Sequence, residues 1–142
     1  MAIRTAQAQW NGDIRSGNGH MRVGSGAFDV AYSFATRFGD SPGTNPEELI
    51  GAAHAGCFSM ATAGALTRAG HPPTSIETTA KVSIEQKPEG FRITGIALET
   101  NAVVPGIDEL QFKTIAEDAK KTCPVSVALS SVPITLNATL KS

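Results

Sequence analysis

The chain has 142 residues, about the length of one domain, and a chain of this size can bury a core without metals or disulfides. It carries 12 Lys and Arg against 13 Asp and Glu, a net charge of −1. This balance does not favour a nucleic-acid-binding or membrane-binding surface, so we expect neither partner. Hydrophobic residues make up 41%, which is typical of a single soluble domain spanning residues 1–142. The charged fraction of 18% is low and hints at surface hidden in an oligomer.

The chain contains only two cysteines, Cys57 and Cys123. His20, His54 and His71 are scattered, and none pairs with a cysteine at zinc-ligand spacing, so we expect no metal. The first residues show no apolar signal segment, which favours a cytoplasmic protein. In that reducing compartment a cysteine pair is more often catalytic or merely buried than a structural disulfide.

The N-terminal part predicts strands. Residues 3–10 precede the turn signal Asn11-Gly12 and predict an edge strand, and a glycine-punctuated meander follows. Residues 28–34 alternate between large apolar and small or polar side chains, which predicts a half-buried strand. Residues 38–44 predict a loop.

A long helix is predicted from Pro46 to about residue 69. Asn45 suits the N-cap, Pro46 the first helical position, and Gly70 the stop. Residues 49–67 carry no charge and approach the length that spans a membrane. They include polar residues and many Ala and Gly but few large aliphatics, so a central helix of a soluble protein explains them better.

The C-terminal part combines strands and helices. The expected elements are a one-face-buried strand at 76–85, a turn at 88–90, a partner strand at 91–100 with a bulge at Gly95, a helix at 108–121, a short helix at 125–129 with Cys123 as its cap and Pro124 at its first position, and a last strand at 132–140. The order of the elements predicts an α+β fold with an antiparallel sheet.

Several side chains are candidates for chemistry, and each has a plain structural alternative. Cys57 lies mid-helix with no cation nearby in sequence, so it is either inert or activated from elsewhere in the fold. Cys123 begins a helix, which favours a thiolate, but spacing does not show whether the two cysteines meet. His54, one turn from Cys57, is either a nucleophile's base or a satisfied core histidine.

Two charged residues are further candidates. Arg37 lies between Phe34 and Phe38 and is either a partly buried donor or a snorkelling surface residue. Glu47 lies in the first turn of the long helix, where a carboxylate is stabilising in any case.

Together, several segments resemble the OsmC/Ohr family, and most closely its OsmC branch of osmotically inducible peroxidases. They are Thr36-Arg37-Phe38, GTNPEELIGAAHAGCFSM at 43–60, IETTAKVSIE at 76–85, VPGID at 104–108 and TCPVS at 122–126. The resemblance spans nearly the whole chain. It implies an α+β fold with antiparallel sheets around two long central helices in an intertwined homodimer.

The resemblance also implies a thiol-dependent peroxidase that reduces organic hydroperoxides to alcohols. By motif, Cys57 corresponds to the peroxidatic cysteine, Cys123 to the resolving cysteine, and Arg37 and Glu47 to the catalytic arginine and glutamate. The alternatives to Arg37 in this role are Arg4, Arg15 and Arg22. The Cys57 sulfenic acid would condense with Cys123 to a disulfide, and a dithiol or lipoylated-protein reductant would restore it, without a bound cofactor.

Helix geometry makes a separate prediction. Glu47 and Cys57 are ten residues apart on one helix, or about 15 Å, too far for one arginine to bridge easily. If they share a site, Glu47 comes from the partner subunit or the chain bends.

Apolar residues near Cys57, namely Ile50, Phe58 and Met60, predict a preference for bulky organic hydroperoxides over hydrogen peroxide.

Two other functions compete with the peroxidase. A non-catalytic protein that binds a hydrophobic ligand would keep its function when Cys57 is replaced. A hydrolase with a Cys57–His54 pair would need an acyl substrate and would give Cys123 no role.

Overall fold

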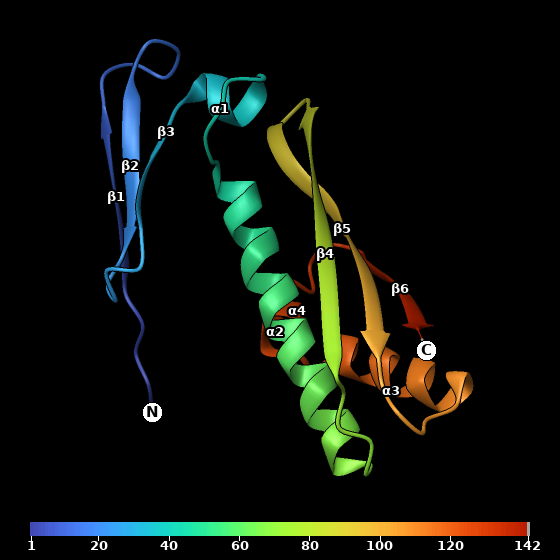
Figure 1. The fold of residues 1–142 in the computed structure, drawn as a ribbon. Helices are drawn as coiled ribbons and strands as arrows, with labels where there is room; N and C mark the ends of the chain where they lie inside the picture. The colour runs from blue at the N-terminus through green and yellow to red at the C-terminus, as the bar shows by residue number, and fades with distance from the viewer. Residues whose placement is uncertain (142) are drawn as a thin grey trace. The chain divides into compact units, whose positions relative to one another are not determined.

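The computed structural model describes residues 1–141 (Figure 1). Its elements, in chain order, are β1 (Ala6–Asn11), β2 (Asn18–Val23), β3 (Asp29–Tyr32), α1 (Phe34–Phe38), α2 (Pro46–Arg68), β4 (Ser75–Lys87), β5 (Gly90–Val103), α3 (Glu109–Thr122), α4 (Pro124–Ala128) and β6 (Ile134–Lys141). The chain divides into two compact units, Met1–Leu49 and the part from Ile50 onward.

The first unit contains a three-stranded antiparallel sheet in the order β1-β2-β3. The predicted strands are present, although β1 begins at Ala6 rather than at Ile3. Among the residues of this unit, only Gly19 and Glu47 are buried. The first unit therefore lacks a core of its own. A sheet of this size needs an apolar cover to be stable, and that cover must come from outside the unit.

Helix α1 differs from the prediction, which placed residues 34–38 at the end of a strand and the start of a loop. The Thr36 N–H donates to Ser33 Oγ (3.3 Å), and the Ser33 N–H donates to Thr36 Oγ1 (2.9 Å). This reciprocal pair is a capping box with Thr in place of the usual Glu or Gln. Because Thr is not the usual residue there, the sequence analysis did not predict a helix start at Ser33. The resulting turn positions Arg37.

Helix α2 confirms the predicted helix signals. The Glu48 N–H donates to Asn45 Oδ1 at 2.9 Å, so Asn45 caps the helix as expected. The Asn45 side-chain amide also donates to the carbonyl of Thr36 at 3.1 Å, which fixes the start of α2 relative to α1. The helix ends before Gly70, whose φ of +86° favours glycine.

The second unit contains the sheet β4-β5-β6. Strands β4 and β5 are antiparallel, and the predicted bulge is present: Ser83 pairs with Gly95 and Ile84 with Ile93, which leaves Thr94 as the extra residue. Strand β6, in contrast, runs parallel to β5, so the prediction of a wholly antiparallel sheet was wrong for this pair. Helices α3 and α4 form a crossover that returns the chain to the starting end of β5, as parallel pairing requires.

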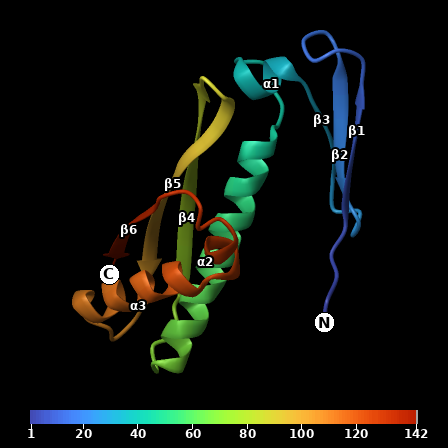
Figure 2. The same ribbon diagram turned by 180° about the vertical axis from the view of Figure 1, so that it is seen from behind.

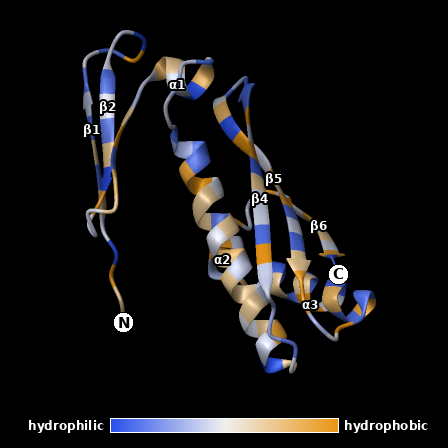
Figure 3. Cartoon of the chain, viewed as in Figure 1, coloured by the Kyte–Doolittle hydropathy of each residue, from blue (hydrophilic) through white to orange (hydrophobic). Residues whose placement is uncertain are grey.

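One face of this sheet packs against helices α2 and α3. Apolar and polar residues alternate along β4 (Figure 3), and the apolar residues point to the helix side. Helix α3 lies beside β6 in both ribbon views (Figures 1 and 2). The main core cluster is formed by Phe58, Ile96, Leu98, Ala116, Ala119 and Cys123.

Helix α2 keeps an exposed apolar face. By length and composition it is long and apolar enough to cross a membrane, a test that core helices of soluble proteins also pass, and 28% of its most apolar window is buried. Ala52, Ala53 and Gly56 are exposed, and the Met60 side chain is 79% exposed. A Cβ added to Gly56 would meet no atom within 4 Å. Within the second unit, this face therefore has no cover.

Candidate active site

The two cysteines meet in the second unit. Cys57 lies in the middle of α2, and Cys123 lies between α3 and α4; their Sγ atoms are 3.0 Å apart. Both are free thiols, Cys57 half-buried and Cys123 buried. The fold thus brings together two residues that are 66 positions apart, a point the sequence had left open.

Cys123 is held by the helix break that Pro124 imposes. The Cys123 N–H donates to the Ala119 carbonyl at 2.9 Å and closes α3, while the Cys123 carbonyl accepts from the Val127 N–H at 3.0 Å and opens α4. Pro124 occupies the first helical position of α4, as predicted. The cysteine is therefore fixed by backbone bonds on both sides.

The surroundings of the two sulfurs differ. Burial is the largest influence on the pKa of Cys123 and raises it, but interactions with Cys57, with the Ser126 and Val125 N–H groups and with the Ser126 hydroxyl outweigh burial and lower the pKa. For Cys57, burial and then the hydrogen bond with Cys123 raise the pKa. Within this pair, negative charge therefore prefers Cys123, and Cys57 needs a further cation to become the thiolate.

His54 has a partner other than Cys57. Its Nε2 lies 2.7 Å from Ser126 Oγ, and both side chains are buried. His54 Nδ1 has no hydrogen-bond partner in the described structure. His54 is thus paired with Ser126 and not with Cys57, so the contacts do not support a Cys57–His54 nucleophile, but only one of its two ring nitrogens is satisfied, unlike those of the satisfied core histidine. Burial lowers the pKa of His54, which keeps its imidazole neutral.

Arg37 and Glu47 form a close ion pair in the first unit. Arg37 Nη2 donates to Glu47 Oε1 at 2.7 Å, and Arg37 Nε lies 3.2 Å from both carboxylate oxygens. The Glu47 side chain is only 8% exposed and that of Arg37 is 36% exposed. Arg37 Cζ also lies 5.2 Å from the centre of the Phe38 ring. Of the two alternatives for Arg37, the structure therefore shows the partly buried donor beside an aromatic ring and not the snorkelling surface residue.

The other candidate arginines with described contacts have different partners. Arg15 Cζ lies 4.7 Å from the centre of the Phe34 ring, and Arg22 Nε donates to Gln7 Oε1 at 2.8 Å. The pairing with Glu47 thus favours Arg37.

An apolar pocket of about 190 Å³ lies next to Arg37, within the first unit. Two tilted aromatic pairs line it: Trp10 with Tyr32 (5.5 Å between ring centres) and Phe34 with Phe38 (5.0 Å). Sequence reasoning missed this pocket, although the aromatic residues among positions 28–38 were its signal.

The apolar residues near Cys57, from which the sequence predicts a preference for bulky hydroperoxides, are not all accessible to a substrate. Phe58 is fully buried in the core, so counting it among them was wrong. It packs against the sheet because it lies one position from Cys57, and therefore on another side of α2. Met60, in contrast, is 79% exposed.

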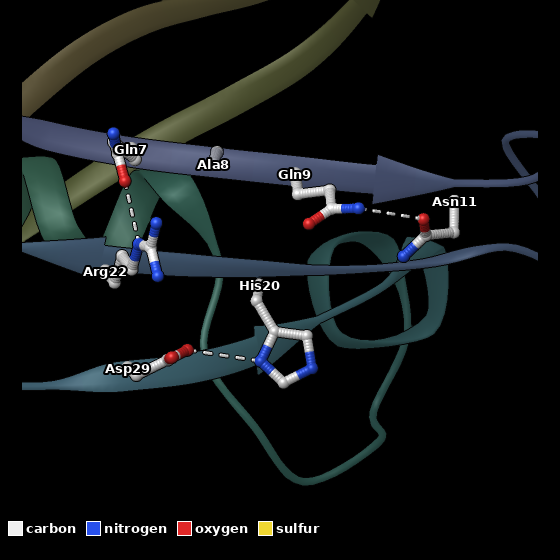
Figure 4. A pocket seen from close by; sticks show the side chains of 7 residues that line it. All are labelled: Gln7, Ala8, Gln9, Asn11, His20, Arg22 and Asp29. Atoms are coloured by element: carbon white, nitrogen blue, oxygen red, sulfur yellow. Dashed lines mark hydrogen bonds and ion pairs between the residues drawn. The ribbon is translucent and has the colours of Figure 1, made fainter.

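A larger, polar pocket of about 450 Å³ lies on the sheet of the first unit (Figure 4). Its side chains pair across the strands: His20 Nδ1 lies 3.2 Å from Asp29 Oδ1, and Arg22 points to Gln7. The described residues that line it include no nucleophilic thiol. The contacts of His20 with Asp29 and of Arg22 with Gln7 are those of an exposed cross-strand ladder.

In the described part of the chain, no group of three or more His, Cys, Asp or Glu lies close enough together to hold a metal ion.

Comparison with known proteins identifies the family. The profile described as "OsmC-like protein" matches residues 39–137. The chain belongs to the OsmC family. It is 51% identical to "Peroxiredoxin OsmC" of Escherichia coli (strain K12) over 98% of this chain and 97% of the relative. It is 35% identical to "Organic hydroperoxide resistance protein" of Xanthomonas axonopodis pv. citri over 78% of both chains.

Solved structures support the same family. The organic hydroperoxide resistance protein from Elizabethkingia anophelis matches with a TM-score of 0.76 and 25% identity over 99% of both chains. The profile match contains Glu47, Cys57 and Cys123, whereas Arg37 lies two positions before it. The resemblance and the α+β fold expected from the sequence are thus confirmed.

Proposed function

We propose that this OsmC-family protein is a thiol-dependent peroxidase that reduces organic hydroperoxides to alcohols. The observation that carries the proposal is the dithiol formed by Cys57 and Cys123, with sulfurs 3.0 Å apart. The expected class of enzyme is confirmed by two relatives, one named a peroxiredoxin and one an organic hydroperoxide resistance protein.

In the first step, the Cys57 thiolate attacks the terminal oxygen of the hydroperoxide. The O–O bond breaks, the sulfur is oxidised to a sulfenic acid, and the alkoxide takes a proton to become the alcohol. Arg37 would supply the missing cation, because a guanidinium stabilises both the thiolate and the developing alkoxide. Glu47 would hold Arg37 in place through the hydrogen bonds described above.

In the second step, Cys123 resolves the sulfenic acid. Its sulfur attacks Cys57, a disulfide forms, and hydroxide leaves as water after taking the thiol proton. A dithiol then reduces the disulfide by exchange. We place dihydrolipoyl groups, free or on a lipoylated protein, in this role, with no bound cofactor, and the cytoplasm as the reducing compartment.

Mass spectrometry after one equivalent of cumene hydroperoxide tests the proposal. We expect the reduced protein to lose two hydrogen atoms, because both thiol protons leave when the disulfide forms, and we expect one equivalent of cumyl alcohol. Unchanged mass and intact hydroperoxide would contradict the proposed function. An unchanged mass with bound hydroperoxide would favour the non-catalytic binding protein.

The proposed assembly is a homodimer in which the two chains complete each other's sites. The first unit has no core of its own, and α2 keeps an exposed apolar face, so both require a cover. Glu47 and Cys57 lie ten residues apart on the uninterrupted helix α2, about 15 Å by helical rise. Arg37 and Glu47 would therefore serve Cys57 of the partner subunit.

The aromatic pocket leads to a prediction about substrate choice. If the hydrocarbon of the substrate enters this pocket and buries about 80 Å² of apolar surface, at roughly 25 cal/mol per Å² binding gains about 2 kcal/mol. We therefore expect kcat/KM to be about thirtyfold higher for cumene hydroperoxide than for hydrogen peroxide. Steady-state kinetics with a single thiol donor measure this ratio.

The variant Phe34→Ala connects the preference to the pocket. We expect it to lower kcat/KM for cumene hydroperoxide about tenfold and to leave that for hydrogen peroxide nearly unchanged. Phe91→Ala is the matched control, since Phe91 is an exposed phenylalanine of β5 that does not line this pocket. Equal losses with both peroxides would exclude the pocket as the specificity determinant.

A further inference from the structure

A chain of hydroxyl groups ties helix α2 to the sheet of the second unit. Ser59 Oγ donates to Thr78 Oγ1 at 2.8 Å, and the hydroxyl oxygens of Thr78 and Thr100 are 2.9 Å apart. Thr100 Oγ1 in turn donates to the carbonyl of Glu77 at 3.2 Å. The three hydroxyls come from α2, β4 and β5, and Thr78 lies directly opposite Thr100 in the pairing of the two strands. The peroxidase steps described above use none of them.

The direction of this chain follows from counting protons. A hydroxyl has one proton to donate, and Thr100 gives its proton to the Glu77 carbonyl, which can only accept. Thr78 must therefore donate to Thr100 and accept from Ser59. All three donors point the same way, from α2 to the backbone of β4, and hydrogen bonds in such a chain strengthen one another. Thr100 is only 1% exposed, so water does not compete for its hydroxyl.

The apolar contacts of α2 do not set its rotation as sharply. Helix α2 runs alongside β4 (Figure 1), and a Cβ added to Gly51 would lie 3.4 Å from Val82 Cγ2, so the two backbones are close there. Phe58 anchors the helix in the core. Apolar contacts are non-directional, whereas a hydrogen bond requires a defined donor and acceptor geometry. The bond from Ser59 to Thr78 is therefore a directional contact between α2 and β4.

This contact acts on the side of α2 that faces away from the cysteine contact. Cys57 and Ser59 lie two positions apart, or about 200° around the helix. On the Cys57 side, His54 is hydrogen-bonded to Ser126 of α4 at 2.7 Å. Polar contacts on two different sides fix the rotation of a helix about its axis. That rotation decides whether the Cys57 sulfur, 3.0 Å from that of Cys123, can approach to the bond length of about 2 Å.

We propose that Ser59, Thr78 and Thr100 are positioning residues for the cysteine pair. Their hydroxyl chain fixes the rotation of α2 and keeps Cys57 within bonding reach of Cys123. The use of this reach to resolve a sulfenic acid rests on the proposed function. The reaction is the second step described above, in which the S–S bond forms, the S–O bond breaks and water leaves. The three hydroxyls exchange no proton with the sulfurs.

The equilibrium of the cysteine pair with glutathione redox buffers tests the proposal. This equilibrium measures the effective concentration of one thiol at the other, which reports how well the fold holds them together. Thr78→Val keeps the shape of the side chain and removes the hydroxyl, so we expect the effective concentration to fall about tenfold. Thr78→Ser keeps a hydroxyl and should restore it. No peroxide is needed, so this measurement remains decisive even if the proposed function fails.

Thr62→Val is the matched control. Thr62 lies on α2 and is 0% exposed, but its hydroxyl has no hydrogen-bond partner in the described structure. The substitution therefore removes a buried hydroxyl without breaking a described hydrogen bond, and the glutathione equilibrium should not change. A loss of stability alone would lower the melting temperature and leave this equilibrium of the folded protein unaltered.

Ser59→Ala removes the same hydrogen bond from its other end, at a half-buried helical position where alanine is well tolerated. We expect the same fall in effective concentration. The double variant with Thr78→Val should fall no further than either single variant, since all three lack one and the same bond. Full additivity of the two losses would mean that the residues act separately and would overturn the proposed chain.

Single-turnover kinetics then locate the effect in the reaction. Thr78→Val should slow the disappearance of the Cys57 sulfenic acid about tenfold and leave the preceding peroxide consumption unchanged. Equal slowing of both steps, a glutathione equilibrium like that of Thr62→Val, or no rescue by Thr78→Ser would overturn the proposal. A shifted glutathione equilibrium in a protein that consumes no peroxide would uphold the positioning role and refute the proposed function instead.

Discussion

Replacing Cys57 by serine is expected to abolish peroxide reduction, with a loss of roughly a thousandfold or more, because a hydroxyl without a base is a far weaker nucleophile than a thiolate. The nearby His54 has its hydrogen bond with Ser126 and none with Cys57 among the described contacts. Steady-state reduction of cumene hydroperoxide with dithiothreitol measures the loss. Near-normal turnover of this variant would disprove the assignment of Cys57.

Cys123→Ser is the matched variant, since it changes the other sulfur of the same pair. We expect one full turnover, because Cys57 still attacks the peroxide, and then a sulfenic acid that excess peroxide oxidises further to sulfinic acid. Single-turnover product analysis and mass spectrometry distinguish these states. A Cys123→Ser protein that consumes no peroxide at all would show that Cys123 is also needed in the first step.

Mixing two inactive variants is expected to restore activity. Cys57→Ser lacks the nucleophile, and Glu47→Ala leaves Arg37 without the carboxylate that holds it, a loss we place at about a hundredfold. If Glu47 serves Cys57 of the partner subunit, each heterodimer has one intact site. An equal mixture that exchanges subunits freely should then recover about a quarter of full activity, since half of the dimers are mixed and half of their sites are intact.

The controls for this experiment are the two variants alone and a mixture without subunit exchange. No recovery after demonstrated exchange would mean that Glu47 acts on the cysteine of its own chain.

The variant Gly56→Lys tests the dimer independently. Gly56 is exposed on α2 with open space around it, so a lysine fits within one chain but places a charge on the exposed apolar face of the helix. Light scattering should report loss of the dimer. Thr79→Lys, on the exposed side of β4, is the matched control.

Local signals in the sequence determined most of the secondary structure. Asn45 and Pro46 start α2, Pro124 separates α3 from α4, and Gly95 marks the bulge of β5, because caps, ring constraints and bulges act over a few residues. The family resemblance rests on the same kind of information, since its motifs are short and contiguous. Helix geometry even separated Glu47 from Cys57 without any coordinates.

Tertiary structure alone decided which distant residues meet and which way they face. The contact between Cys57 and Cys123, the pairing of His54 with Ser126 rather than with Cys57, and the parallel direction of β6 all join segments far apart in the chain. Phe58 shows the same limit, because only packing against the sheet turns it into the core. Spacing along the chain fixes the side of an element on which a residue lies, whereas its neighbours depend on how the elements pack.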